Sequence, residues 1–314
     1  MSFNSDKPRL LITGAGGMVG QNLLAHPDLA ANWQALTPSS GELDLRDRAA
    51  TRAYLERHRP DAVVHCAGVV GGIQANMAEP VRFLAANTEM GLNIVQGCLD
   101  AGIGTLINLS SSCMYPRALG DGLSEDKVLT GELEPTNEGY ALAKIVSMRL
   151  CEFAMRENPA LNYKTLIPCN LYGKWDKFDP KHSHLIPAII HKVHLARENG
   201  EPEVEIWGDG TARREFMYAG DLACAIIRAL ADPAALPVSL NIGLGHDHTI
   251  NKYYQIVADV VGWDGRFVHD LSRPVGMKRK LLDVSQQTAW GWAPQTSLRD
   301  GILATYAFYK EQSK

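Results

Sequence analysis

Three glycines that follow a short apolar segment near the N-terminus limit the possible folds more than any other feature of this sequence. Residues 9–13 read Arg-Leu-Leu-Ile-Thr, and Gly14, Gly17 and Gly20 come directly after them. Because glycine has no Cβ, the backbone can turn tightly there and approach a phosphate group closely. A helix that begins after the turn directs free N–H groups and the positive end of its dipole at that phosphate. Taken alone, the glycines also fit an ordinary strand-to-helix turn.

The first half of the chain alternates short apolar segments with segments of helical periodicity. We expect strands at residues 9–13, 33–37, 62–66, 105–109 and 163–168, and helices that end near Ala25 or cover residues 51–58, 78–101 and 140–157. Alternation at this spacing is typical of strand–helix–strand units and a parallel sheet. The predicted fold class is therefore α/β, with a doubly wound parallel sheet of the Rossmann type.

The sequence changes character after Pro168, where loops lengthen and Trp, His and Pro become more frequent. We therefore expect a smaller C-terminal α/β lobe that binds the substrate. The predicted dinucleotide-binding domain covers residues 1–172, with a segment at about 217–245 that returns to it through a helix at 221–231. The predicted substrate domain covers residues 173–314, and the crevice between the lobes is the expected ligand site.

Composition excludes several classes of function. The 314 residues are 46% hydrophobic and 21% charged, with a formal net charge of −4, which is ordinary for a soluble globular protein. The negative charge argues against nucleic acid or an anionic membrane as a partner. No apolar run reaches the roughly 20 residues that a membrane helix needs, and no signal peptide is evident, so we expect a cytoplasmic protein. Six scattered cysteines without metal-ligand spacing predict free thiols and no metal site.

Tyr140 and Lys144 form a Tyr-x-x-x-Lys motif at an expected helix start, and a spacing of four places both on one helical face. A tyrosine phenol has a pKa of about 10, and a neighbouring ammonium group favours the phenolate. Tyr140 can give its proton to a carbonyl oxygen as hydride arrives, while Ser111 hydrogen-bonds the same oxygen. The motif alone also fits a surface helix. Its position after the glycine turn and a serine loop indicates a dehydrogenase.

The end of the second expected strand bears on the choice of cofactor. An acidic residue there would hold the ribose 2′-hydroxyl of NAD, but the strand ends in Thr37-Pro38-Ser39-Ser40. Hydroxyl and N–H groups can accept a 2′-phosphate that a carboxylate would repel, although no Arg or Lys stands there to bind it strongly. We therefore predict NADP(H). Asp44 is a candidate for contact with the adenine edge, or alternatively for a helix N-cap.

Longer motifs occur in order from about residue 9 to beyond residue 300. They are Val-Gly-Gly-Ile at 70–73, Ser-Ser-Cys-Met-Tyr-Pro at 111–116, Glu-Pro-Thr-Asn-Glu at 134–138, Tyr-Ala-Leu-Ala-Lys at 140–144, Asn-Leu-Tyr-Gly at 170–173, Ser-His-Leu-Ile-Pro at 183–187, Trp-Gly-Asp-Gly at 207–210, Arg-Glu-Phe at 214–216 and Arg-Lys-Leu-Leu-Asp at 279–283. With these motifs the chain resembles the GDP-L-fucose synthases of the extended short-chain dehydrogenase/reductase superfamily.

The resemblance implies an activity and a set of site residues. Enzymes of that family carry out 3,5-epimerisation and then NADPH-dependent C4 reduction of GDP-4-keto-6-deoxy-D-mannose, and they are commonly homodimers. By resemblance, Ser111, Tyr140 and Lys144 carry the reduction, while Cys113 and His184 form the acid/base pair of epimerisation. The residues implied in NADP(H) binding are Gly14, Gly17, Met18, Val19, Gly20, Ser39, Ser40, Asp44, Leu45, Ala67, Tyr140, Lys144 and Asn170. Those implied in substrate binding are Asn170, His184, Lys192, Trp207, Arg214 and Lys280.

Epimerisation and reduction beside a ketone require these kinds of catalytic group, independently of the resemblance. C3 and C5 both flank the C4 ketone, so loss of either proton leaves an enolate on the C4 oxygen, which Tyr140 and Ser111 can stabilise. Inversion needs an acid and a base on opposite faces of the ring, and a thiol and an imidazole are readily tuned for that exchange. Without the resemblance, Cys113 would more often be a packed small residue. His184 would then be half of a surface pair, or of a metal site, with His182.

Departures from the family pattern leave the exact sugar open. Ala219-Gly220-Asp221 stands where Val-Asp-Asp is usual, Arg273-Pro274-Val275-Gly276 stands where Lys-Pro-Asp-Gly is usual, and Gly139 replaces a proline. None of these changes removes a predicted catalytic group. The alternatives are the same chemistry on a dideoxy or heptose 4-keto sugar, or a reductase that epimerises one centre. A dinucleotide-sensing protein without catalysis is more remote, because such proteins tend to lose the Tyr or the Lys.

Overall fold

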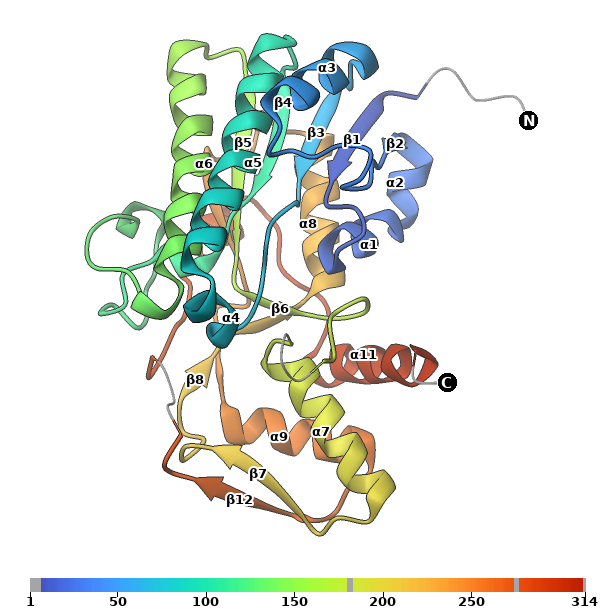
Figure 1. The fold of residues 1–314 in the computed structure, drawn as a ribbon, viewed down its shortest axis with the longest axis vertical. Helices are drawn as coiled ribbons and strands as arrows, with labels where there is room; N and C mark the ends of the chain where they lie inside the picture. The colour runs from blue at the N-terminus through green and yellow to red at the C-terminus, as the bar shows by residue number, and fades with distance from the viewer. Residues whose placement is uncertain (1–6, 180–182, 274–276, 313–314) are drawn as a thin grey trace.

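A six-stranded parallel sheet forms the centre of the molecule in the computed structural model, which describes residues 7–179, 183–273 and 277–312 (Figure 1). The strand order is β10-β5-β4-β3-β1-β2, and every neighbouring pair runs parallel. The strands are β1 (Arg9–Thr13), β2 (Gln34–Leu36), β3 (Ala62–His65), β4 (Thr105–Leu109), β5 (Asn162–Pro168) and β10 (Ser239–Ile242). The predicted α/β class with a doubly wound parallel sheet is confirmed.

Helices cover both faces of this sheet, as an all-parallel sheet requires. Helices α3 (Arg48–His58), α5 (Pro80–Asp100) and α6 (Glu138–Glu157) lie on one face, and α1 (Met18–Leu24) and α8 (Ala219–Ala231) lie on the other (Figure 1). Successive side chains of a strand point to opposite faces. Leu11 accordingly packs in the hydrophobic cluster of α3, α5 and α6, whereas Leu10 and Ile12 pack in the cluster that contains α8.

A short helix that we did not predict comes directly before a predicted one. The helix expected at residues 78–101 is α5, and α4 (Ile73–Ala78) ends just before it begins at Pro80. Glu79 between them has φ −130° and ψ 50°, because the ring of a following proline disfavours the helical region for the residue before it. Proline itself is well placed in the first turn of α5, since it has no N–H to leave unpaired.

The remaining elements form a second, smaller set (Figure 1). Strands β7 (Glu203–Trp207) and β12 (Arg266–Asp270) pair in parallel beside α7 (Leu185–Asn199), α9 (Ile250–Val261) and α11 (Leu298–Gln312). Their shared apolar core includes Ile189, Val193, Tyr253, Val257, Ile302 and Tyr306. This core is separate from the two clusters that contact the large sheet.

Short elements join the two sets. β6 (Asn170–Tyr172) pairs with β9 (Phe216–Tyr218), and β8 (Arg213–Arg214) pairs with β11 (His248–Thr249). After β9 the chain runs through α8 into β10, so a segment far along the sequence completes the sheet next to β5. The other helical segments are α2 (Pro27–Asn32), α10 (Ser285–Ala289) and the turns Ser112–Met114, Glu125–Lys127 and Pro135–Asn137.

Two sequence expectations concern the molecule as a whole. All six cysteines are free thiols, as predicted. In the part of the chain that the structure describes, no helix is both long enough and apolar enough to cross a membrane.

Candidate active site

The glycine turn after β1 has the close backbone contacts that its sequence predicts. Gly14 has φ +69°, and a Cβ there would lie 2.7 Å from Cα of Ala67. A Cβ on Gly20 would lie 2.5 Å from Cα of Ala15, so side chains are excluded at both positions. Gly17 caps α1 with no side-chain hydrogen bond, which leaves the first N–H groups of the helix, including those of Met18 and Val19, without side-chain partners. A Cβ on Gly16 would meet nothing within 4 Å, so space for a ligand is open above the turn.

The loop after β3 connects this turn to the predicted catalytic helix. Ala67 packs against Gly14, and the next residue, Gly68, would place a Cβ 3.8 Å from Nζ of Lys144. Asn87 of α5 holds the loop, since its Oδ1 accepts from Val69 N at 2.8 Å and its Nδ2 donates to Val69 O at 3.1 Å. A dinucleotide that binds at the glycine turn therefore has a direct path to Lys144 along residues 67–69.

The end of β2 has an acidic group that the sequence analysis missed. Glu42 folds back, and its Oε2 accepts from both N and Oγ of Ser39 at 2.8 Å each, while Ser40 is exposed. Asp44 pairs with Arg46 at 2.6 Å, and hydrogen bonds from Arg46 lower the pKa of Asp44 to about 2. The alternative of Asp44 as an N-cap is wrong, because Asp47 caps α3 by accepting from Ala50 N at 3.0 Å.

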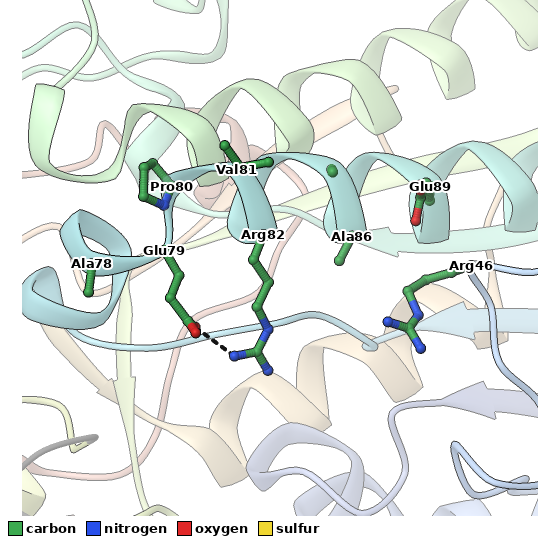
Figure 2. Close-up of a pocket in the computed structure, with 9 residues that line it drawn as sticks. Arg46, Ala78, Glu79, Pro80, Val81, Arg82, Ala86 and Glu89 are labelled. Atoms are coloured by element: carbon green, nitrogen blue, oxygen red, sulfur yellow. Dashed lines mark hydrogen bonds and ion pairs between the residues drawn. The ribbon is translucent and has the colours of Figure 1, made fainter.

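The neighbouring Leu45 is buried, and its carbonyl accepts from Asn93 Nδ2 at 2.9 Å. A shallow depression of about 500 Å³ adjoins this loop. Figure 2 shows Arg46 and Arg82 directed into it from opposite ends, with Arg82 paired to Glu79. The residues that line it are Arg46, Ala78, Glu79, Pro80, Val81, Arg82, Ala85, Ala86 and Glu89, and none of them is a predicted catalytic residue.

Tyr140 and Lys144 lie one turn apart near the start of α6, as their spacing predicts. Nζ of Lys144 is 5.7 Å from the centre of the Tyr140 ring and donates to the carbonyl of Leu109 at the end of β4, at 2.9 Å. Burial raises the pKa of Tyr140 and lowers that of Lys144. The expected lowering of the Tyr140 pKa is therefore wrong for this structure, in which the ammonium group is directed to Leu109. A phenol that keeps its proton at neutral pH is nonetheless the form that donates to a ketone oxygen.

The serine loop after β4 places Ser111 and Cys113 beside this pair. Oγ of Ser111 accepts from Cys113 N at 3.3 Å and caps the helical turn Ser112–Met114. Cys113 is buried, with 6% of its surface exposed. Burial raises the pKa of the Cys113 thiol, whereas Lys280, then Ser111 and then Lys144 act in the opposite direction.

Two predicted substrate residues lie on the other side of Cys113. Lys280 and Arg214 are both half-buried, and burial lowers the pKa of each. The charge of Cys113 favours the Lys280 ammonium, while the nearby Arg214 guanidinium disfavours it. Asn170 on β6 also belongs to this region, since its Nδ2 donates to Glu215 O at 2.9 Å. Electrostatic interactions therefore link Cys113 to Lys144 and Lys280, and Lys280 to Arg214.

His184 enters from the second set of elements, at the N-cap of α7. Burial, and then Lys177, lower its pKa, so the imidazole is neutral at pH 7. Within the described residues, His184 makes no hydrogen bond to the other four predicted catalytic side chains. The preceding Ser183 has its carbonyl 3.6 Å from the position of a Cβ on Gly72, which places α7 beside the loop before α4. His182 and Val275 lie outside the described residues.

The last two predicted substrate residues form a separate group around Glu205. Nζ of Lys192 donates to the Glu205 carbonyl at 2.5 Å, and Nε1 of Trp207 donates to the Glu205 carboxylate at 2.9 Å. Trp207 is 44% exposed, and the guanidinium of Arg273 lies 5.1 Å from the centre of its ring. The Arg273 guanidinium therefore makes a cation–π contact with the exposed indole of Trp207.

Sequence reasoning missed four polar side chains of this region. Asn87 and Glu42 are described above. Glu215 and Asp247 are buried carboxylates, of which Glu215 accepts from Leu244 N and Asp247 accepts from Nε of Arg213. An amide inside the apolar face of α5 was a usable signal for Asn87. The other three depend on how loops fold against each other, and no spacing in the sequence reveals that.

Comparisons with known proteins agree with this geometry. A family model, the NAD dependent epimerase/dehydratase family, matches residues 10–243. A GDP-L-fucose synthase from Azorhizobium caulinodans is 54% identical over 301 residues, covering 96% of each chain. A GDP-L-colitose synthase from Yersinia pseudotuberculosis is 52% identical over 301 residues, covering 96% of this chain and 97% of that protein. A solved GDP-mannoheptose C4 reductase from Campylobacter jejuni with NADP bound is 28% identical, with a TM-score of 0.87, and covers 97% of this chain and 98% of its own.

The parallel sheet, the glycine turn and the tyrosine–lysine pair define an oxidoreductase of the extended short-chain dehydrogenase class. The chain belongs to the NAD dependent epimerase/dehydratase family, and its near relatives within that family include GDP-L-fucose and GDP-L-colitose synthases. The family that the sequence motifs predicted is thereby confirmed.

Proposed function

We propose that this enzyme inverts C3 and C5 of GDP-4-keto-6-deoxy-D-mannose and then reduces C4, which is the activity of a GDP-L-fucose synthase. The observation that carries the proposal is the position of Cys113. Its backbone N donates to Oγ of Ser111, and its thiol interacts electrostatically with Lys280, Lys144 and Tyr140, so a proton-transfer group stands beside the residues proposed for the reduction. A reductase without epimerisation needs no thiol there. The relative that is 54% identical over nearly the whole chain supports the same activity.

NADP(H) is the proposed cofactor, and the residues of the chain fit it. The glycine turn is open above Gly16 and has an uncapped helix start, as a diphosphate requires. At the ribose end, N and Oγ of Ser39 already converge on one carboxylate oxygen of Glu42. A 2′-phosphate can take the same two donors by displacing Glu42. NADP is bound in the solved relative from Campylobacter jejuni. When bound, the cofactor supplies the hydride for the reduction.

The residues of this chain supply the proton and the polarisation for the reduction. Tyr140 keeps its proton because burial raises its pKa, so it can donate that proton to the C4 oxygen. Ser111 hydrogen-bonds the same oxygen. Lys144, which donates to the Leu109 carbonyl, would hold the ribose of the cofactor with its other N–H groups.

Cys113 and His184 are the proposed acid/base pair for the two inversions. Burial raises the pKa of Cys113 and lowers that of His184, so both are neutral before reaction. When one of these two groups takes a proton from the sugar and the other gives one back, the pair changes from thiol and imidazole to thiolate and imidazolium. The total number of protons on the pair stays the same. The pair can therefore remove a proton from one face of the ring and return one to the other. The enolate formed in between has its charge on the C4 oxygen, where Tyr140 and Ser111 stabilise it.

A dideoxy sugar is the second candidate substrate. The GDP-L-colitose synthase of Yersinia pseudotuberculosis is nearly as similar, at 52% identity, and its product name implies a different sugar on the same nucleotide. The contacts around Cys113 fit both. A heptose substrate has weaker support, from the solved reductase that is 28% identical.

We also propose how the chain divides and assembles. Residues 1–172 with 217–245 would bind the dinucleotide, and residues 173–314 would bind the nucleotide sugar. Lys192 and Trp207 would then bind the base of the nucleotide sugar, and Arg214 and Lys280 would bind its diphosphate. The enzyme would act in the cytoplasm.

A homodimer is the proposed assembly. Helices α5 and α6 lie side by side on the outer face of the sheet (Figure 1) and expose Val81, Leu84, Leu142, Val146 and Phe153. An apolar face of this kind is typical of a protein interface. The same helix pair of a second copy would cover it about a two-fold axis.

One experiment decides between the two sugars. The enzyme is incubated with NADPH and either GDP-4-keto-6-deoxy-D-mannose or its dideoxy analogue, and the products are identified by NMR. We expect the 6-deoxy substrate to give GDP-L-fucose at the higher kcat/KM. A higher kcat/KM with the dideoxy sugar would instead identify the enzyme as a colitose-type synthase, and no turnover of either would refute the proposal.

A further inference from the structure

Two pairs of adjacent basic residues are divided between the inside and the outside of the site. Arg214 and Lys280 are both half-buried, and Lys280 interacts electrostatically with Arg214 and with Cys113. Their neighbours in sequence, Arg213 and Arg279, instead converge on the carboxylate of Asp247. Nε of Arg213 donates to Oδ1 of Asp247 at 2.7 Å, and Nε of Arg279 donates to Oδ2 at 2.6 Å.

This carboxylate is buried, with 2% of its side chain exposed, while both arginines remain partly exposed. Burial alone would raise the pKa of Asp247, but the hydrogen bonds and charges of Arg213 and Arg279 lower it below its usual value. Arg213 also donates to the Asp247 carbonyl at 2.9 Å. We call Arg213, Asp247 and Arg279 the Asp247 clamp.

The Asp247 clamp joins three chain segments, of which two, β8 and β11, also pair as a two-stranded sheet. Arg213 belongs to β8, Asp247 precedes β11, and Arg279 lies in the segment after β12. The backbone contributes one hydrogen bond from Arg213 N to Lys278 O, at 2.9 Å. Successive side chains of a strand point to opposite faces, so fixing Arg213 in β8 also fixes the direction of Arg214. Arg279 is bonded directly to Lys280, so holding Arg279 limits where the Lys280 backbone can lie.

We propose that Asp247 is a positioning residue, which sets Arg214 and Lys280 at the diphosphate of the nucleotide sugar by holding Arg213 and Arg279 from outside. This inference rests on the proposed function, because that function assigns Arg214 and Lys280 to the diphosphate. Arginine binds a diphosphate through a planar set of donors, and a displacement of the strand removes one or more of those bonds. Asp247 itself touches no reacting atom.

The test compares two ligands that bind in different places. Asp247→Asn leaves one arginine without an acceptor, so the Kd for GDP and the KM for the GDP-sugar should rise by about tenfold or more, the factor expected for one charged hydrogen bond. The Kd of the variant for NADPH should stay within about twofold of the wild-type value. The matched control is Asp121→Asn. Asp121 pairs with Arg279 at 2.6 Å from an exposed position, and exposed pairs contribute little, so both affinities should be unchanged.

Four outcomes overturn the inference, and the last of them overturns the proposed function as well. If Asp247→Asn weakens GDP and NADPH by the same factor, Asp247 is only structural. If GDP affinity is unchanged, the clamp does not set the site. If Asp247→Asn does not fold, Arg279→Gln is the second variant, because it keeps Asp247 paired with Arg213. Arg279→Gln should still raise the Kd for GDP several-fold. An unchanged Kd for GDP in Arg279→Gln refutes the clamp. A wild-type enzyme that binds NADPH but not GDP refutes the proposed function, and the clamp's role with it.

Discussion

The carboxylate of Glu42 accepts two hydrogen bonds from Ser39, one from the backbone N and one from Oγ, each 2.8 Å long. Ser39 stands at the end of β2, where the ribose of a dinucleotide is expected. These bonds lower the pKa of Glu42, so the carboxylate is ionised at neutral pH. It therefore competes with a 2′-phosphate for the donors of Ser39, and it can itself accept a hydrogen bond from a 2′-hydroxyl.

Glu42→Gln should therefore raise the preference for NADPH over NADH. We expect wild type to prefer NADPH and the ratio of the two kcat/KM values to increase by about tenfold in the variant, since one charged competitor is lost. Steady-state kinetics with both cofactors measures it. Glu56→Gln, on the exposed side of α3, is the control and should leave the ratio unchanged. A ratio that falls in Glu42→Gln would show that the carboxylate does not face the ribose.

Tyr140→Phe removes the proposed proton donor and keeps the ring. General acid catalysis contributes roughly a hundred- to ten-thousand-fold, so C4 reduction should fall by about that factor while NADPH still binds. Single-turnover oxidation of NADPH, followed by absorbance, gives the rate, and fluorescence titration gives the binding. NADPH oxidation at the wild-type rate would rule out Tyr140 as the donor.

Cys113→Ser should lose inversion while it keeps part of the reduction, because Ser111, Tyr140 and Lys144 remain. A hydroxyl exchanges protons far less readily than a thiol. The reaction is run in heavy water, and deuterium at C3 and C5 is counted by NMR. Wild type should carry label at both carbons, and the variant should shift toward an uninverted D-sugar. Full labelling at both carbons by the variant would make Cys113 a packed thiol.

His184→Gln tests the other member of the pair in the same assay. Glutamine keeps a polar group at the N-cap of α7, so the helix should form, but it cannot take up or release a proton near neutral pH. Inversion should slow while Tyr140-dependent reduction persists. Equal loss of both activities would indicate that His184 positions the substrate and does not exchange protons.

Asp176 predicts a pH dependence of stability. Its Oδ1 accepts from Lys177 N at 2.8 Å, its Oδ2 is buried without a hydrogen-bond partner, and burial raises its pKa to about 7. The unfolded carboxyl has a pKa of about 4, so the folded chain binds the proton more tightly. The contribution of Asp176 to stability is present below about pH 4 and is lost as the pH rises through 7.

Asp176→Asn should therefore gain in Tm relative to wild type by roughly a few degrees between pH 5 and pH 8. Circular dichroism melts at the two pH values measure the difference, and the exposed Asp264→Asn is the control, for which no such gain is expected. The same Tm difference at both pH values would mean that Asp176 does not titrate in this range.

The proposed dimer is tested by placing a charge on the exposed face of α5 and α6. Val146→Asp should convert the dimer into a monomer in size-exclusion chromatography with light scattering, since an unpaired charge in an apolar interface is costly. Leu271→Asp is the matched control, because Leu271 is 74% exposed and lies just after β12. Dissociation by both variants, or by neither, would place the interface elsewhere.

The sequence predicted those features whose residues lie close together in the chain. β1, the glycine turn and the Tyr140–Lys144 spacing depend on neighbours, and the structure has them where we expected them. The break at Glu79 was also local, but the helical periodicity on both sides concealed it. Glu42 and Asp247 could not be found this way. Glu42 folds back from a loop, and Asp247 meets Arg213 from 34 residues away, so their roles depend on tertiary packing.

The late arrival of β10 in the sheet has a consequence for synthesis. β5 is complete at Pro168, but its partner on that side begins only at Ser239. While the ribosome translates the residues between them, the nascent chain carries an open sheet edge, and an open edge can pair with other chains. The large sheet cannot gain β10, its edge strand on that side, until α8 and β10 have left the exit tunnel. Truncated products that end before Ser239 would therefore aggregate, and chaperones have most to protect during that interval.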